Sequence, residues 1–379
     1  MGKQIRNIAL FVIFSAIMAG CFLKSEKLNI VGTKPSGKEK NISEDDHAPS
    51  PFVQHEKFYI QDRHWDWDEY DYLRYFIVTI SNDGYNLDWV ADHPGIENIW
   101  IMRGGDIDGF DFSPLTSLEK LRRLEIWCQD ETFRQIPDLS SIRSLKRLKL
   151  RDIYAHSFAD IGNKMPNLDS LLLDIHGEGR TIDLTGLSAI QTLKELTVWG
   201  LYASGSEFLF DFSGMHNLEK LECPGNSTVV KGLDSLRSLK NFEADFYQPK
   251  QFGALNELTA LEALTLLVDN DVSDFSFIEH LENIEGIWLR NVNAQEVEGV
   301  SPPKKKEPYH IELDISALRN KKKLKTLLLA GFAIDNIDVL NHLPALEKLS
   351  LINCYINPDN DYTLLNKNLK VETYRPYFK

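Results

Sequence analysis

Apolar residues recur along most of this chain in one repeated spacing. The pattern L-x-x-L-x-x-L-x-L, in which other apolar residues can replace leucine, begins near Ile96 and returns until Tyr355. The first apolar residue of its closing L-x-L falls at positions 99, 124, 148, 171, 196, 221, 242, 264, 287, 327 and 349. Neighbouring copies are thus 21 to 25 residues apart, except for one step of 40. Ten or eleven copies at this period predict a solenoid.

Each copy contains two local signals. The closing L-x-L alternates with period two, so it predicts a short strand with both apolar side chains on one face. The preceding L-x-x-L-x-x-L has period three, which favours a 3-10 or irregular helical turn. One copy cannot bury its own leucines, so stacked copies are expected to share one core beneath a parallel sheet.

The repeat resembles the leucine-rich-repeat family, and the stretches Val272–Ile278 and Ile334–Leu340 resemble its short internalin-like subclass. This resemblance implies an α/β solenoid with a parallel sheet on the concave face and short helical or 3-10 turns on the convex face. Only Asn226 and Cys354 fit the family's asparagine position after the strand. Elsewhere this position is occupied by Gln129, Asp152, His176, Leu201, Tyr247 and Phe332. A regular asparagine ladder is therefore not expected.

The first 51 residues carry a different pattern from the repeats. A basic start, an apolar run from Ile8 to Met18 and small residues predict a secretory signal peptide over residues 1–20. Met18-Ala19-Gly20-Cys21 resembles the lipobox of bacterial lipoproteins, which implies a lipid on Cys21; the alternative is an ordinary signal peptide with an incidental cysteine. Residues 21–51 are polar and predict a flexible tether after that cysteine.

These features predict a lipid-anchored protein of the bacterial cell envelope, attached to the membrane through Cys21. Phe22, rather than an aspartate, follows that cysteine. By resemblance to enteric lipoproteins this favours the outer membrane, at the cell surface or on the periplasmic face, over the inner membrane.

The ends of the repeat array predict caps. Residues 52–95 are dense in aromatics and lack the repeat, so they are interpreted as an N-terminal cap; residues 96–356 are the repeats, and residues 357–379 the C-terminal cap. Acidic residues among the cap aromatics could form a cation or sugar site, but a solvated amphipathic surface is favoured. The long step marks an insertion near residues 295–309, interpreted as a solvated loop rather than a binding loop.

Charge and cysteine content narrow the possible functions. The 42 basic residues become 40 against 56 acidic ones once residues 1–20 are removed, a net charge of −16. This balance argues against nucleic acid as a partner. If Cys21 carries lipid, three scattered cysteines remain, without the close spacing of a zinc site. Cys223 falls in a core position and Cys354 in the asparagine position, so both are expected to be buried.

The chain lacks the common catalytic and metal-binding sequence motifs. G-x-S-x-G, H-E-x-x-H and a phosphate-binding glycine loop do not occur, and Asp269-Asn270-Asp271 and Asp359-Asn360-Asp361 lack the spacing of a calcium loop. The sequence therefore predicts a non-enzymatic protein without a cofactor or metal.

The residues beside the two apolar positions of each strand are expected to point to the concave face. Tryptophan and arginine often dominate protein-binding energy, and both occur there. The predicted partner-binding residues are Trp100, Trp127, Lys149, Arg151, Leu172, Trp199, Glu222, Glu243, Asp245, Trp288 and Arg290. A protein partner is the first hypothesis; a glycan stacked on the tryptophans, or an envelope scaffold facing the periplasm, is the alternative.

Overall fold

The computed structural model describes residues 53–55, 58–64, 74–80, 87–104, 110–129, 134–154, 158–176, 179–202, 206–223, 227–246, 255–268, 272, 274–292, 310–356 and 370–372. The predicted signal peptide, Cys21, the tether and the 295–309 insertion lie outside these residues. Within the described part of the chain, no helix is both long and apolar enough to cross a membrane.

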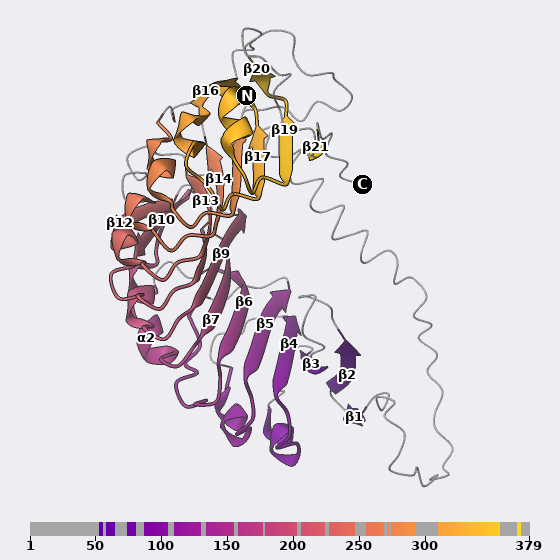
Figure 1. The fold of residues 1–379 in the computed structure, drawn as a ribbon. Helices are drawn as coiled ribbons and strands as arrows, with labels where there is room; N and C mark the ends of the chain where they lie inside the picture. The colour runs from indigo at the N-terminus through magenta and orange to yellow at the C-terminus, as the bar shows by residue number, and fades with distance from the viewer. Residues whose placement is uncertain are drawn as a thin grey trace, which may run out of the picture. The chain divides into compact units, whose positions relative to one another are not determined.

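Among the described residues, one sheet of fifteen strands runs through the repeats and into both predicted caps (Figure 1). In sheet order its strands are β1 (Val53–His55), β2 (Phe58–His64), β3 (Arg74–Ile80), β4 (Asn98–Gly104), β5 (Arg123–Gln129), β6 (Arg147–Ile153), β7 (Ser170–His176), β9 (Glu195–Tyr202), β11 (Lys220–Cys223), β13 (Asn241–Phe246), β14 (Ala263–Val268), β15 (Gly286–Asn291), β17 (Thr326–Ala330), β19 (Lys348–Ile352) and β21 (Lys370–Glu372). Pairing is antiparallel from β1 to β3 and parallel from β3 onward.

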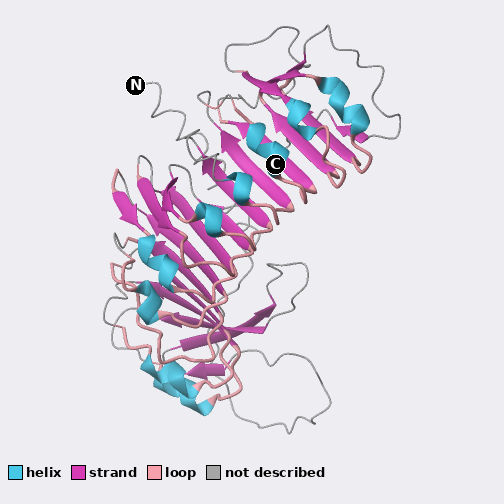
Figure 2. Ribbon diagram, turned by 60° about the vertical axis from the view of Figure 1, so that its left-hand side comes forward, coloured by secondary structure: helices cyan, strands magenta, loops and turns pink. Residues whose placement is uncertain are grey.

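The opposite side of the repeats carries short helical turns, as Figure 2 shows. Most are 3-10 turns, at Asp88–Asp92, Ser113–Ser117, Thr185–Ala189, Leu233–Ser235, Ser276–His280, Ile315–Leu318 and Ile337–His342; α2 (Ile161–Lys164) is a single α-helical turn. Their apolar residues and the strand leucines form one core cluster. The structure therefore confirms the predicted α/β leucine-rich-repeat solenoid.

The strand register follows the period seen in the sequence. The first apolar residues of successive L-x-L motifs pair directly with one another, for example Leu196 with Leu221 and Leu221 with Phe242. All of these residues from Ile99 to Leu349 are at most 2% exposed. Cys223 and Cys354 are buried, as predicted. Burial raises the pKa of the Cys354 thiol to about 11, which keeps it protonated and unreactive.

Repeated pairs of backbone hydrogen bonds also join the start of a strand to the preceding repeat. Two consecutive backbone N–H groups at a strand's start donate to one carbonyl of the preceding repeat; those of Lys146 and Arg147 both donate to Arg122, at 2.9 Å. The same arrangement joins Lys325 and Thr326 to the carbonyl of Glu285. The step of 40 residues therefore leaves the sheet register intact.

Several turns of the repeats, including the 3-10 turns that start at Ser113, Thr185, Ser276 and Ile315, begin within an Asp-x-Ser or Asp-x-Thr sequence. In each, one aspartate oxygen accepts the backbone N–H two residues later, at 2.8 to 3.0 Å. The aspartates are Asp111, Asp138, Asp183, Asp211, Asp274 and Asp314. Hydrogen bonds from Ser276 lower the pKa of Asp274 below its ordinary value. The motif caps the turn much as an N-cap residue caps a helix.

Two further sheets were not expected from the sequence. β8 (Thr181–Asp183), β10 (Glu207–Asp211) and β12 (Ser227–Lys231) form one, and β16 (Ile311–Asp314), β18 (Phe332–Asp335) and β20 (Tyr355–Ile356) the other. In β10, Phe208 and Phe210 alternate with more exposed residues and are buried, so period two extends beyond the L-x-L motif. The side expected to hold only turns thus carries short parallel strands as well.

Both predicted caps contribute strands to the main sheet. β3 lies in the segment interpreted as the N-terminal cap and pairs in parallel with β4. The turn after it buries Leu87, Trp89 and Val90 in the common core. β21 lies in the predicted C-terminal cap and pairs in parallel with β19.

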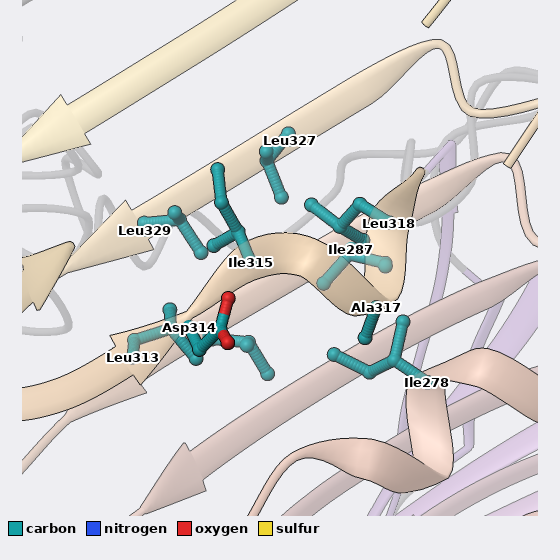
Figure 3. Close-up of a pocket in the computed structure, with 10 residues that line it drawn as sticks. Ile278, Ile287, Leu313, Asp314, Ile315, Ala317, Leu318, Leu327 and Leu329 are labelled. Atoms are coloured by element: carbon teal, nitrogen blue, oxygen red, sulfur yellow. The ribbon is translucent and has the colours of Figure 1, made fainter. Parts of the chain in front are cut away.

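A small apolar cavity lies between β15, β16 and β17 (Figure 3). Its walls include Ile287, Leu313, Ile315, Leu318 and Leu329. Its volume of about 10 Å³ is near that of one water molecule, and its lining offers almost no polar surface. We interpret it as a packing defect rather than a ligand site.

Candidate functional site on the open face of the sheet

The face of the main sheet opposite the core, called the open face below, presents two columns of side chains. In the first column each residue pairs with the next across neighbouring strands: Trp100, Glu125, Lys149, Leu172, Thr197, Glu222, Glu243, Thr265, Trp288, Leu328 and Ser350. The second column, two residues later, includes Trp127, Arg151, Asp174, Trp199, Leu267, Arg290, Ala330 and Ile352; the backbone of Asp245 pairs with that of Leu267. The register thus brings the predicted residues side by side.

The pairing is irregular where β6, β7 and β9 meet. The β6–β7 register shifts between Leu150 and Ile153, and the β7–β9 register shifts between Asp174 and His176. Asp152 adopts a left-handed backbone with φ of +62°, which is uncommon for a residue other than glycine. Strained backbone and bulges of this kind concentrate at functional sites.

Trp127 lies at the centre of a cluster formed at this irregularity. Its indole N–H donates to Asp152 Oδ2 at 2.5 Å, and the Arg151 guanidinium carbon lies 4.9 Å from its ring centroid. Trp100 stacks against it with ring centroids 6.3 Å apart. Trp100 is only 9% exposed, so it offers little surface of its own to a partner.

Arg151 lies between two carboxylates of neighbouring strands. Its Nη1 is 3.9 Å from Glu125 Oε1, and its Nε is 3.9 Å from Asp174 Oδ2. The Asp174 side chain is only 3% exposed, and its Oδ1 has no hydrogen-bond partner among the residues that the structure describes. Burial, with the nearby charge of Asp152, raises the pKa of Asp174 to about 6 despite the opposing effects of Arg151 and His176. Burial also raises the pKa of Glu125.

Asp152 also connects Trp127 to His176 and Tyr154. Its Oδ1 is 2.8 Å from His176 Nε2, and His176 Nδ1 is 3.1 Å from the hydroxyl of Tyr154. Asp152, His176 and Tyr154 were not among the predicted partner-binding residues. The available signal was that Asp152 and His176 occupied positions where the repeat family has asparagine. A polar side chain at such a position that does not join an asparagine ladder can contact neighbouring side chains instead.

A second polar contact lies in the middle repeats. Trp199 Nε1 donates to Glu222 Oε1 at 2.7 Å, and the Thr197 hydroxyl lies 3.4 Å from Glu222 Oε2. Glu243 is paired with Glu222 in the register and is exposed. The neighbouring strands still partly desolvate its carboxylate, and this desolvation, followed by the charge of Glu222, raises the pKa of Glu243. The side chain of Asp245 lies outside the described part of the structure.

The later repeats present a more apolar part of the open face. Trp288 is 51% exposed and pairs in the register with Thr265 on one side and Leu328 on the other. Leu267 and exposed Arg290 are partners in the second column. In the earlier repeats Lys149 and Leu172 are half-buried members of the first column.

No family model matches this chain, and no curated protein matches it in sequence. Solved structures do. An internalin, InlF, from Listeria monocytogenes is 19% identical, with 79% of this chain and 87% of that one covered and a TM-score of 0.48. A leucine-rich-repeat protein of Leptospira interrogans is 14% identical, with 76% and 98% covered and a TM-score of 0.32. The similarity is to leucine-rich-repeat proteins, internalins among them.

A plant peptide hormone receptor in complex with RGF2 also matches, at 15% identity and a TM-score of 0.39. The match covers 70% of this chain but only 45% of the receptor. At these identities and TM-scores no function is carried over from any of these proteins. Among the described residues, no group of three His, Cys, Asp or Glu side chains is placed to hold a metal ion.

Proposed function

We propose that this protein is a non-catalytic interaction module that binds a protein partner through the open face of its sheet. One observation carries the proposal: the register places Trp127, Arg151, Trp199 and Trp288 on one face of a rigid parallel sheet. Tryptophan and arginine on a preformed surface lose little conformational entropy on binding, so they contribute strongly to affinity.

A protein partner is preferred to a glycan because of how the tryptophans are held. Sugar stacking needs exposed ring faces, and only Trp288 of the four predicted tryptophans is more than half exposed. Trp127 and Trp199 use their indole N–H groups on carboxylates of the protein itself. Such half-buried, oriented rings suit the centre of a protein interface better.

Site-specific photocrosslinking tests the open-face proposal. A benzoylphenylalanine is placed at Leu172 or Leu328 on the open face, or at the control positions Glu257 or Glu282, which are exposed outside the strands. After irradiation of cells of the native host, we expect discrete adducts from the open-face positions and none from the controls. Adducts from the control positions alone, or from no position, would contradict the proposal.

We further propose that a lipid on Cys21 anchors the protein in a bacterial envelope, with the outer membrane favoured. The support is the apolar run that ends at Met18-Ala19-Gly20-Cys21. Cys21→Ala is expected to release the protein into the soluble fraction, since acyl chains supply about 0.8 kcal/mol per buried methylene. Proteinase treatment of intact cells then reports the face: digestion supports surface display, and protection supports a scaffold facing the periplasm. Unchanged membrane association of the variant would exclude the anchor.

A further inference from the structure

The most exposed large apolar side chain of the described residues, Trp288, lies in the later repeats of the open face. Among the described residues with large apolar side chains, only Tyr154 and Trp288 are exposed, at 38% and 51%. Trp288 adjoins Leu328 on β17, and Leu267 on β14 belongs to the neighbouring column. We name Leu267, Trp288 and Leu328 the Trp288 patch. Tryptophan is enriched among the residues that dominate binding energy at protein interfaces, so exposed Trp288 is suited to anchor a partner.

Two glutamates continue the same column toward the middle repeats. Glu222 on β11 and Glu243 on β13 are direct register partners, an arrangement that places like charges opposite each other and costs stability. Neither forms an ion pair with a lysine or arginine in the described part of the chain. Glu222 is held in place by the indole of Trp199. The negative charge of this pair is therefore available to a cationic partner.

We propose that the partner presents an extended segment in which a basic side chain meets Glu222 and Glu243 while an apolar side chain packs on the Trp288 patch. The proposal rests on the open-face function above and specifies its ligand. Charge complementarity selects the basic residue, and the overall charge of −14 adds long-range attraction for a cationic segment. Trp288 and Leu328 select an apolar residue because they would otherwise remain in water.

The spacing of the sheet determines the spacing within the partner. Glu243 and Trp288 lie in one column on β13 and β15, with β14 between them. Two strand separations of about 4.8 Å place their positions about 10 Å apart. A segment in the extended polyproline II conformation rises about 3.1 Å per residue with three residues per turn, so its side chains i and i+3 share one face and lie about 9 Å apart. The expected motif is therefore basic-x-x-apolar, read from β13 toward β15.

Selection from a phage library of random twelve-residue peptides tests this motif. On the full chain we expect enrichment of lysine or arginine three positions from leucine, phenylalanine or another large apolar residue. Synthetic peptides with the enriched motif should lose about tenfold or more in affinity for Trp288→Ala, as expected for an anchor residue. The double variant Glu222→Lys/Glu243→Lys should instead enrich acidic-x-x-apolar peptides.

The matched control is Glu257→Lys/Glu282→Lys, which makes the same change of charge on exposed residues outside the strands. It should select the same peptides as the unmodified chain. Circular dichroism and the thermal midpoint establish that each variant is folded. Enriched peptides whose binding depends on Trp127 or Arg151 but that lack the motif would overturn this inference and leave the open-face function standing. Absence of any enriched peptide would also overturn it, while photocrosslinking would still decide the function itself.

Discussion

Gly232→Ala is expected to destabilise the solenoid by about 3 kcal/mol, the sum of a backbone cost and a steric cost. Gly232 immediately precedes the 3-10 turn Leu233–Ser235 and has φ of +86°, in the left-handed region that disfavours a side chain. An added Cβ would also lie 2.2 Å from the backbone nitrogen of Ser213. That atom belongs to the preceding repeat, so neither repeat can move without breaking their contact.

Substitutions at two other glycines separate the backbone cost of the left-handed φ from the steric cost of the added Cβ. Gly179 has φ of +62° but nothing within 4 Å of an added Cβ, so Gly179→Ala should cost only about 1 to 2 kcal/mol. Gly95 has open space and no positive φ, and Gly95→Ala should change stability by less than about 0.5 kcal/mol. Urea unfolding followed by circular dichroism measures all three. A Gly232 variant no less stable than the Gly179 variant would refute the steric part of the prediction.

The columns of the open face could be predicted from the sequence because side chains alternate strictly along a strand. Once L-x-L marks two core positions, the residues between and after them must lie on the other face. Trp127 and Arg151, which are 24 residues apart in the chain, are register partners for this reason. The insertion did not disturb the prediction, because β17, the next strand of the main sheet after it, still pairs with β15.

The cluster around Asp152 could not be predicted in the same way. The repeat spacing assigns Asp152 to the asparagine position, but in the structure Ile153 pairs with Ile175 and is buried. The left-handed backbone at Asp152 and the register shift beside it depend on how β6 and β7 pair, which the repeat period does not specify. Membership of a column also predicts only the side of the sheet on which a residue lies. It does not predict how much of the side chain its neighbours cover, as the low exposure of Trp100 illustrates.

The buried charge of Asp174 leads to the second large prediction. Asp174→Asn is expected to stabilise the folded protein by about 3 kcal/mol at pH 7. In the folded state the pKa of Asp174 rises from 3.8 to about 6. The folded protein therefore binds more protons than the unfolded chain between about pH 4 and pH 6, and the contribution of Asp174 to stability falls as the pH rises through that window. Asparagine resembles the protonated form and removes this loss.

The pH dependence of the difference between variant and unmodified protein isolates this effect. The variant should match the unmodified protein near pH 4 and gain stability up to about pH 7, measured by urea unfolding at each pH. Asp169→Asn is the matched control, because Asp169 precedes β7 and its side chain is 43% exposed in a pair with Lys146. It should change stability by less than about 0.5 kcal/mol. A difference that does not vary with pH would show that Asp174 is not destabilised by its charge.

The same variant connects stability with function. Asp174 and Glu125 both flank Arg151, so Asp174→Asn leaves the guanidinium with one counter-charge and with its position over Trp127 less restrained. Proteins commonly tolerate a destabilising charge where binding or catalysis uses it. We therefore expect Asp174→Asn to be more stable and yet to crosslink its partner less efficiently from Leu172, the open-face position between Lys149 and Thr197. Greater stability with undiminished crosslinking would place the Arg151 cluster outside the interface.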